Sequence, residues 1–369
     1  MGGYLAALIY SAANFAVLYP GNRWRALVFA LWFLFGASLP LGIIQVRYRL
    51  QLRRLGGVAL AFVLHLSAAF LILNVWTFLA TFSSMTTPSL KEALFLLSAA
   101  LLWIAYGVTR AQRISVRHLT LKVFAPIAHA PIRIVAAADI HAGAIVERRY
   151  LKHLQKNIAH CRPDLFLLLG DVSDGDISCA VTAGLPEMLE DIDASLGKYA
   201  VLGNHDLYAG ASASCSLLIN TGFVVLQDET EIIDNVFVLA GRNDPRGKYF
   251  GVPRASLTSL IGTKNDGQPM ALPVVVADHT PQNLEEAFDC GVALQLSGHT
   301  HGGQVFPFNL LMRWVYGISS GSIRKGATTV CVSSGAGLWT MPLRTVTNSE
   351  IVLCTLEFEV RSSDCSTSL

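Results

Sequence analysis

The stretch Leu294-Gln295-Leu296-Ser297-Gly298-His299-Thr300-His301-Gly302-Gly303 places two histidines directly after a short β-prone run. Runs of this kind, bounded by turn residues, are typical of buried strands. Side chains two residues apart point to opposite faces of a strand. Beyond the strand end, however, the flanking glycines let the backbone bend tightly, so that both histidines can turn toward one metal ion.

Four more motifs on the amino-terminal side of this stretch repeat the same arrangement. They follow short apolar runs at residues 134–138, 165–169, 199–202 and 273–277, and read Asp139-Ile140-His141, Gly170-Asp171, Gly203-Asn204-His205-Asp206 and Asp278-His279. Sites in α/β folds are built at the carboxyl ends of strands. The side chains are carboxylates, imidazoles and one amide, without a thiolate, which suits a pair of divalent ions. Asp171 is the candidate to bridge the two ions, and the pattern predicts a two-metal hydrolase.

Each motif alone is a weak signal, because Asp and Asn are also common turn residues. The prediction depends on all five motifs, each at an expected strand end. The other histidines lie in ordinary helix, strand or loop contexts and are expected to be packing or surface residues: His65, His118, His129, His153 and His160.

Strands and helices alternate along the second part of the chain. Residues 119–123 alternate apolar and polar side chains, and further strands are expected at 236–240, 329–333 and 351–358. Residues 150–160 and 179–196 have the length and spacing of crossover helices. This rhythm predicts α/β layers with two sheets packed together.

The first third of the chain differs sharply in composition from the rest. Residues 1–122 carry eleven Lys and Arg against one acid, Glu92, and the remainder carries 17 bases against 25 acids. The mean hydropathy of +0.46 is high for a soluble protein. Four uncharged apolar stretches explain it, at residues 4–20, 26–46, 57–82 and 93–109. The second and third are long enough to span a bilayer, whereas the first and fourth are near the limit. We expect four membrane helices, although the first stretch resembles a signal peptide without a basic start.

The basic residues of the loops predict the orientation. Arg47, Arg49, Arg53 and Arg54 lie in one loop and four bases follow the fourth stretch, whereas the alternate loops carry fewer. Positively charged loops stay in the cytoplasm, so four spans would place both termini and the catalytic part there. The seven cysteines, odd in number and without paired spacing, are expected to be reduced.

The five motifs resemble those of the calcineurin-like metallophosphoesterases, over roughly residues 115–360. The extended ending from Ser297 to Gln304 is similar to a bacterial branch with membrane-anchored members, which includes transmembrane metallophosphoesterases and a UDP-2,3-diacylglucosamine hydrolase of lipid A synthesis. One departure is Thr280, where an Asn after the histidine is more usual.

The resemblance implies a role for each matching residue. Asp139, His141 and His301 would hold the first metal, Asp171 would bridge, and Asn204, His279 and His299 would complete the second. His205 would stabilise the phosphoryl oxygens or protonate the leaving group, with Asp206 orienting it.

The resemblance also implies a fold and cofactors. The fold would be a four-layer sandwich of two mixed sheets flanked by helices, over residues 111–369, preceded by an all-helical membrane domain over residues 1–110. Two divalent ions are implied, with Mn²⁺ the usual one and Fe²⁺ or Zn²⁺ also compatible with such ligands.

The expected activity is hydrolysis of a phosphodiester or pyrophosphate bond in a membrane lipid, with UDP-2,3-diacylglucosamine the most concrete substrate. The alternatives are a broader phosphoesterase acting on soluble esters and an inactive membrane scaffold. The apolar run at residues 305–316 is either a lip that enters the bilayer interface or a loop packed on the core. Arg242, Arg246 and Arg254 are expected at the solvated surface, with contact to a diphosphate as the alternative. The expected partners are the bilayer and a lipid or lipid-linked nucleotide in the inner membrane of a bacterium. Neither nucleic acid nor a protein partner is indicated.

Overall fold

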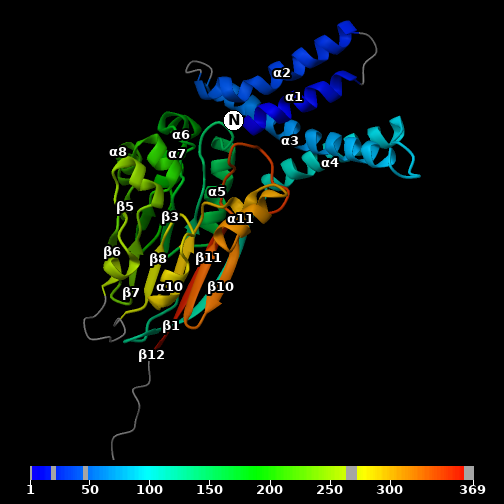
Figure 1. The fold of residues 1–369 in the computed structure, drawn as a ribbon. Coiled ribbons are helices and arrows are strands. Elements are labelled where there is room, and N and C mark those ends of the chain that lie inside the picture. The colour runs from blue at the N-terminus through cyan, green and yellow to red at the C-terminus, as the bar shows by residue number, and fades with distance from the viewer. Residues whose placement is uncertain (1, 18–21, 45–48, 263–271, 361–369) are drawn as a thin grey trace, which may run out of the picture. The chain divides into compact units, whose positions relative to one another are not determined.

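The computed structural model describes residues 2–17, 22–44, 49–262 and 272–360 (Figure 1). The chain forms two compact units. We call them the helical unit, residues 1–112 together with Thr340–Thr345, and the α/β unit, residues 113–339 and 346–369. The sequence prediction placed the whole of residues 111–369 in one domain, whereas the structure assigns the segment Thr340–Thr345 to the helical unit.

The helical unit contains α1 (Gly2–Val17), α2 (Asn22–Ile44), α3 (Arg49–Ala80) and α4 (Leu90–Ala111). Two stretches of the described helices are long and apolar enough to cross a membrane, Gln51–Ala80 and Leu90–Ala111, and Arg25–Ser38 is a shorter apolar helix. Most side chains of the two long helices are exposed, including Phe95 and Leu102, each with 72% of its surface accessible. Side chains this apolar need a lipid environment, and the helical unit therefore associates with a membrane.

The segment Thr340–Thr345 packs on the carboxyl-terminal turns of α4. The backbone N–H of Arg344 donates to the carbonyl oxygen of Gly107 at 3.0 Å, and Arg110 donates from Nη1 to the Thr345 carbonyl oxygen at 3.0 Å. A Cβ atom at Gly107 would lie 3.2 Å from the Leu343 side chain, so glycine permits this close approach. Arg344 is fully buried.

The first sheet of the α/β unit contains six strands in the order β1-β12-β2-β3-β4-β5. Their bounds are β1 Ile114–Ala125, β12 Ser349–Val360, β2 Ile132–Ala137, β3 Leu165–Leu169, β4 Lys198–Val201 and β5 Phe223–Val225. Only β12 and β2 pair antiparallel. The fully apolar β3 is buried along its length, as expected for a central parallel strand.

The second sheet has the order β10-β11-β9-β8-β7-β6. Its strands are β10 Gly321–Lys325, β11 Thr328–Val332, β9 Leu294–Ser297, β8 Val274–Ala277, β7 Phe237–Gly241 and β6 Glu229–Ile233. The two edge strands pair antiparallel and the inner ones parallel. One apolar core contains side chains of both sheets, such as Ile134, Leu167, Leu239 and Leu294, so the sheets pack face to face.

Helices complete the layers on the outer faces. A second apolar core lies between strands of the second sheet and the short helices α9 (Leu257–Ile261) and α10 (Glu285–Asp289). The other helices are α5 Arg148–His160, α6 Ile177–Ala183, α7 Leu185–Glu190, α8 Asn204–Asn220 and α11 Phe308–Tyr316, with 3₁₀ turns η1 (Pro245–Phe250) and η2 (His301–Gly303). The predicted sandwich of two mixed sheets flanked by helices is confirmed (Figure 1).

Two details of the prediction differ. The expected helix over residues 179–196 is two short helices, because Gly184 takes a left-handed φ of 87° between them. The strands β5, β6 and β10 were not expected. All three are short, and β6 and β10 are largely exposed edge strands without an apolar run.

Candidate metal centre

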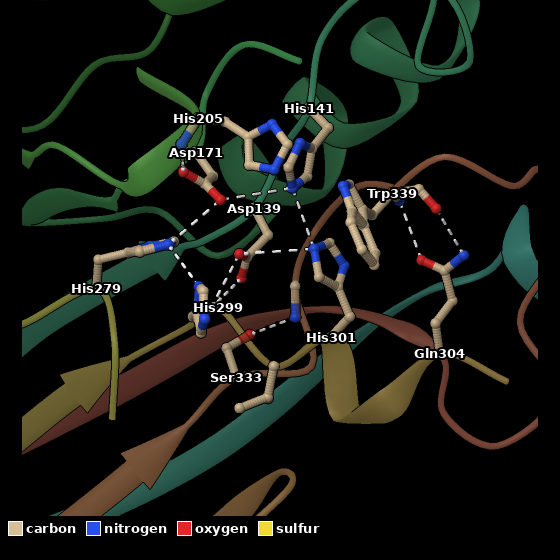
Figure 2. Close-up of polar contacts among 12 residues, drawn as sticks. Asp139, His141, Asp171, His205, His279, His299, His301, Gln304, Ser333 and Trp339 are labelled. Carbon is tan, nitrogen blue, oxygen red and sulfur yellow. Dashed lines mark hydrogen bonds and ion pairs between the residues drawn. The ribbon is translucent and has the colours of Figure 1, made fainter. Parts of the chain in front are cut away.

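The five sequence motifs meet at one edge of the two sheets. They follow β2, β3, β4, β8 and β9, and within each sheet these strands are parallel neighbours. Their carboxyl ends therefore lie together, and their side chains point toward one another (Figure 2).

The backbone of the motifs is unusual. Asp139, His141, Asp171, His299 and His301 all have positive φ, between 49° and 69°. A left-handed conformation costs a non-glycine residue about 1–3 kcal/mol and is concentrated at functional sites. In a continuing strand these side chains would point to opposite faces of the sheet. The turns bring them together at the strand ends instead.

Neighbouring glycines make room for the turns. A Cβ atom at Gly298 would lie 2.5 Å from the Asp139 carboxylate, and one at Gly203 would lie 2.5 Å from the backbone nitrogen of Asp171. Both distances are shorter than side-chain carbons adopt, so only glycine allows the strand ends to approach this closely.

The first cluster consists of Asp139, His141 and His301. The Nε2 atoms of the two histidines lie 3.1 Å apart, and Asp139 Oδ1 lies 3.7 Å from His301 Nε2. All three side chains are buried. Two imidazole nitrogens and a carboxylate converging on one point form a ligand set for a divalent ion.

The second cluster consists of Asp171, His279 and His299. His279 Nδ1 lies 2.7 Å from the carbonyl oxygen of Leu169, which can only accept a hydrogen bond, so Nδ1 carries a hydrogen and Nε2 is the ring atom that remains to bind a metal ion. That Nε2 lies 3.3 Å from Asp171 Oδ2 and 3.3 Å from His299 Nδ1. Nε2 is thus the atom that His279 turns toward the centre of the cluster.

Asp171 lies between the two clusters. Its Oδ2 is 3.8 Å from His141 Nε2 in the first cluster and 3.3 Å from His279 Nε2 in the second. Its Oδ1 accepts a hydrogen bond from the backbone N–H of His205 at 2.7 Å, which fixes the carboxylate in this orientation. One carboxylate therefore reaches both clusters.

The residues present fit a pair of divalent ions. Asn204 Oδ1 is buried and makes no hydrogen bond within the described part of the chain, and such an oxygen is costly unless it coordinates a cation. His299 and His301 turn to different clusters. This corrects the expectation, drawn from their spacing, that both could face one ion, and agrees with the roles that the family resemblance implied.

His205 lies at the rim beside the first cluster. Its Nδ1 is 3.8 Å from Asp174 Oδ1. Its ring packs edge to face against the ring of His141, with the two ring centroids 4.7 Å apart. Burial and the charge of His141 lower the pKa of His205 to about 4. A divalent ion nearby would lower it further, so His205 is neutral at neutral pH.

Asp206 has a different role from the one expected. Its carboxylate accepts hydrogen bonds from the backbone N–H groups of Asp171, Val172, Ser173 and Gly203, at distances from 2.7 to 3.4 Å. It therefore fixes the loop that carries the bridging Asp171, and the carboxylate beside His205 is Asp174.

The charges of the second cluster are strongly coupled. Burial opposes the charge of His279, but the adjacent Asp171 carboxylate outweighs it and raises the pKa of His279 well above its usual value. Burial and the charge of His279 lower the pKa of His299 to about 4, with Arg246 acting in the same direction. Burial raises the pKa of Asp139 to about 6. These are the shifts that concentrated, desolvated ligands show.

Sequence reasoning missed several residues at the site. Tyr316, the last residue of α11, places its hydroxyl 3.0 Å from His299 Nε2. The Trp339 ring stacks on the His301 ring with 6.2 Å between the ring centroids. The Gln304 side chain donates a hydrogen bond to the Trp339 carbonyl oxygen and accepts one from its backbone N–H, both at 3.0 Å (Figure 2). Gln304 lies in the recognised motif, but nothing in the sequence indicates that it holds Trp339.

The arginines of the loop after β7 also differ from expectation. Arg242 is buried and pairs with Asp278 at 3.4 Å and Glu286 at 3.0 Å, and Arg254 donates to Asp278 at 2.7 Å. Only Arg246 of the three is exposed. Of the five histidines that were expected to be packing or surface residues, none belongs to a cluster of candidate metal ligands among the described residues, and His65 bonds to the Ala61 carbonyl within α3.

Comparison with known proteins agrees with this geometry. Residues 132–303 match the calcineurin-like phosphoesterase family. The chain is 32% identical over 229 residues to a metallophosphoesterase of Aquifex aeolicus, covering 61% of this chain and 85% of that protein. It is 29% identical to a metallophosphoesterase of Helicobacter pylori, covering 60% and 58%, and 29% identical to a transmembrane protein with metallophosphoesterase domain of Danio rerio, covering 60% and 52%. It thus spans a little over half the length of the last two. With these matches and two clusters of candidate metal ligands at the strand ends, the chain belongs to the calcineurin-like metallophosphoesterase family.

Proposed function

We propose that this protein is a membrane-anchored phosphoesterase that uses two divalent ions. The observation that carries the proposal is the Asp171 carboxylate: one of its two oxygens, Oδ2, lies within 3.8 Å of a histidine from each cluster. When bound, a pair of divalent ions supplies Lewis-acid activation of a phosphoryl oxygen and of water at neutral pH. Asp139, His141, His301 and Asp171 would hold the first ion, and Asp171, Asn204, His279 and His299 the second.

The surrounding residues define what the protein itself contributes. A neutral His205 can donate one N–H hydrogen bond to a phosphoryl oxygen, which favours stabilisation of the developing charge over proton transfer to the leaving group. Asp206 keeps the Asp171 loop rigid, and Trp339 covers one face of His301. The ion is proposed to be Mn²⁺, and Fe²⁺ and Zn²⁺ suit the same ligands.

The proposed substrate is a lipid with a phosphodiester or pyrophosphate bond, such as UDP-2,3-diacylglucosamine. Two observations support a lipid. The chain has two exposed apolar helices of membrane-spanning length. In addition, α11, whose Tyr316 contacts His299, buries none of its residues and exposes Leu310 and Trp314. An apolar helix next to the site suits acyl chains or the bilayer interface.

Two other functions remain as alternatives. A broad phosphoesterase acting on soluble esters would need the membrane helices only for location. An inactive scaffold is disfavoured by the complete ligand set and by the orphan oxygen of Asn204. We propose the bacterial inner membrane, crossed several times, as the location, with the α/β unit on the cytoplasmic side because the loops there are basic.

The test uses the full chain in detergent with Mn²⁺. We expect hydrolysis of bis(p-nitrophenyl) phosphate and release of UMP from UDP-2,3-diacylglucosamine in mixed micelles. Asp171→Ala should lower both activities by more than about 100-fold and reduce bound metal, because altering even the partners of metal ligands costs about 10–100-fold. Asp289→Ala, which changes an exposed acid on α10, is the control.

The outcomes distinguish the phosphoesterase activity from the lipid substrate and from the inactive scaffold. Hydrolysis of the soluble diester without UMP release would remove the lipid A substrate and leave the phosphoesterase. Full metal content without any hydrolysis would favour the scaffold.

A further inference from the structure

A pocket adjoins the second cluster. It has a volume of about 200 Å³, and its lining includes Arg246, Lys248, Tyr249, Gln282, His299 and Tyr316. Among the residues that the structure describes, no Asp or Glu lines it. The volume is several times the ~30 Å³ that a water molecule occupies, so it can receive a polyatomic group. His299 forms part of its wall, so a group bound there would lie beside a metal ligand.

The backbone that presents Arg246 is firmly fixed. Asp244 is buried, and its Oδ1 accepts a hydrogen bond from the Arg246 backbone N–H at 2.8 Å. Its Oδ2 accepts from the Thr280 hydroxyl at 2.5 Å, next to His279 in the chain. The departure from the family pattern at Thr280 therefore ties η1 to the loop that carries a metal ligand. The backbone of Arg246, from which its guanidinium extends, is therefore held in place beside the second cluster.

The cations of this loop divide into two pairs. Arg242 and Arg254 are compensated by Asp278 and Glu286 inside the fold. Arg246 and Lys248 are exposed, and within the described residues neither forms an ion pair. Lys248 lies 4.9 Å from the centre of the Tyr249 ring. Two cations that form no ion pair within the described residues thus lie in the wall of this pocket.

From this arrangement we infer that the pocket binds a second phosphate group of the substrate, on the side of the scissile phosphoryl group that faces the second cluster. The inference rests on the proposed function and narrows it to substrates with two adjacent phosphates, such as pyrophosphate diesters. A guanidinium offers two parallel N–H donors to phosphate oxygens, and Lys248 adds a point charge. A diester with one phosphate leaves the pocket unused.

The test compares two unreactive probes as inhibitors of bis(p-nitrophenyl) phosphate hydrolysis by the full chain with saturating Mn²⁺. Methylenediphosphonate carries two phosphonates and methylphosphonate carries one. Arg246→Gln is expected to weaken inhibition by methylenediphosphonate by about tenfold or more, because a hydrogen bond to a charged group contributes about 1.5–3 kcal/mol. Inhibition by methylphosphonate should weaken much less, so that the selectivity of the protein for methylenediphosphonate over methylphosphonate falls.

Three further variants sharpen the result. Lys248→Gln should also weaken inhibition by methylenediphosphonate more than inhibition by methylphosphonate, but by a smaller factor. Arg246→Lys should recover part of the inhibition that Arg246→Gln loses, since lysine keeps the positive charge but lacks the two parallel N–H donors. Arg324→Gln is the matched control, because it changes an exposed arginine on β10 that donates a hydrogen bond to the Gly326 carbonyl oxygen. Equal loss for both probes, or no loss for either, would overturn the inference.

Direct binding separates this inference from the proposed function. If the wild-type chain hydrolyses no diester, the proposed function fails, but calorimetric titration of metal-loaded protein with methylenediphosphonate still reports on the pocket. Weaker binding to Arg246→Gln than to Arg324→Gln supports the pocket, and identical binding rejects it.

Discussion

His299 is held at both ring nitrogens by residues far apart in the sequence. Its Nδ1 faces His279, and its Nε2 lies 3.0 Å from the Tyr316 hydroxyl. Partners on the second nitrogen fix the orientation and tautomer of a metal-binding histidine. Tyr316→Phe should therefore lower the affinity of the second ion by about 10–100-fold while the fold is retained. Metal titration of the full chain with Mn²⁺, followed by calorimetry, measures this affinity.

The control for this substitution is Tyr249→Phe, which removes another hydroxyl from the same pocket. It should leave the affinity of both ions unchanged. Equal affinities in wild type and Tyr316→Phe would show that the hydroxyl does not position His299.

A second residue-scale prediction concerns Asp164 and Arg133, which lie where β3 and β2 begin. Two side-chain hydrogen bonds of 3.1 and 3.2 Å join them, and the Arg133 backbone N–H adds a third. Burial alone would raise the pKa of Asp164, but Arg133 outweighs it and the net pKa is lowered. The resulting stabilisation is present above the unfolded pKa of about 3.9 and is lost as the pH falls through the lower folded value.

Asp164→Asn should thus be less stable than wild type at pH 7 by about 0.5–1 kcal/mol, since the pair is partly exposed. The difference should shrink toward zero below the folded pKa of Asp164. Thermal unfolding of both chains in detergent across this range measures it. A difference that stays constant with pH would contradict the assigned cause.

At the residue scale, the sequence predicted ligands but not their supports. Six of the expected ligands lie in two clusters, since each follows a recognisable strand. Tyr316, Trp339 and Arg246 come from other loops and helices, and their contacts depend on tertiary packing that no local pattern encodes. The role of Asp206 was misassigned for the same reason, because its four partners are backbone groups.

Among the secondary-structure elements, α11 invites a direct test. It exposes Leu310 and Trp314, with 82% of the tryptophan surface accessible, and its last residue touches the site. If this face enters the bilayer interface, a charge there opposes insertion. Leu310→Asp with Trp314→Asp should lower activity on the lipid substrate in vesicles by about tenfold or more, since each buried apolar side chain contributes about 1.5–3 kcal/mol.

The same double variant should hydrolyse bis(p-nitrophenyl) phosphate at the wild-type rate. Ile232→Asp, which charges an exposed isoleucine on the edge strand β6, is the control. A parallel loss on both substrates would indicate that α11 supports the fold instead.

The elements that the sequence predicted are those with a continuous apolar run. The central strands β3, β8 and β9 were all expected, because both of their faces are buried and their composition shows it. The edge strand β10 has a single apolar residue, Ile323, and its pairing with β11 is visible only in three dimensions. Gly184 divides a helix that its length alone would predict as continuous.

For the whole molecule, the charge distribution predicts which side of the membrane carries the α/β unit. A green fluorescent protein fused after residue 369 should fluoresce in a bacterial host, and a periplasmic alkaline phosphatase at the same point should be inactive. The reverse result would place the α/β unit outside and exclude a cytoplasmic substrate. Composition predicts two domains from the sequence, whereas the assignment of residues 340–345 to the helical unit depends on contacts in three dimensions.

That assignment means the chain visits the helical unit twice, once before Arg113 and again at Thr340–Thr345. Expressing residues 113–369 alone would strip the fully buried Leu343 and Arg344 of their covering on α4, directly after Trp339 at the metal centre. The truncated chain would then expose an apolar side chain and a guanidinium that the intact chain buries. Because a segment late in the sequence belongs to the helical unit, experiments on the α/β unit need the intact chain.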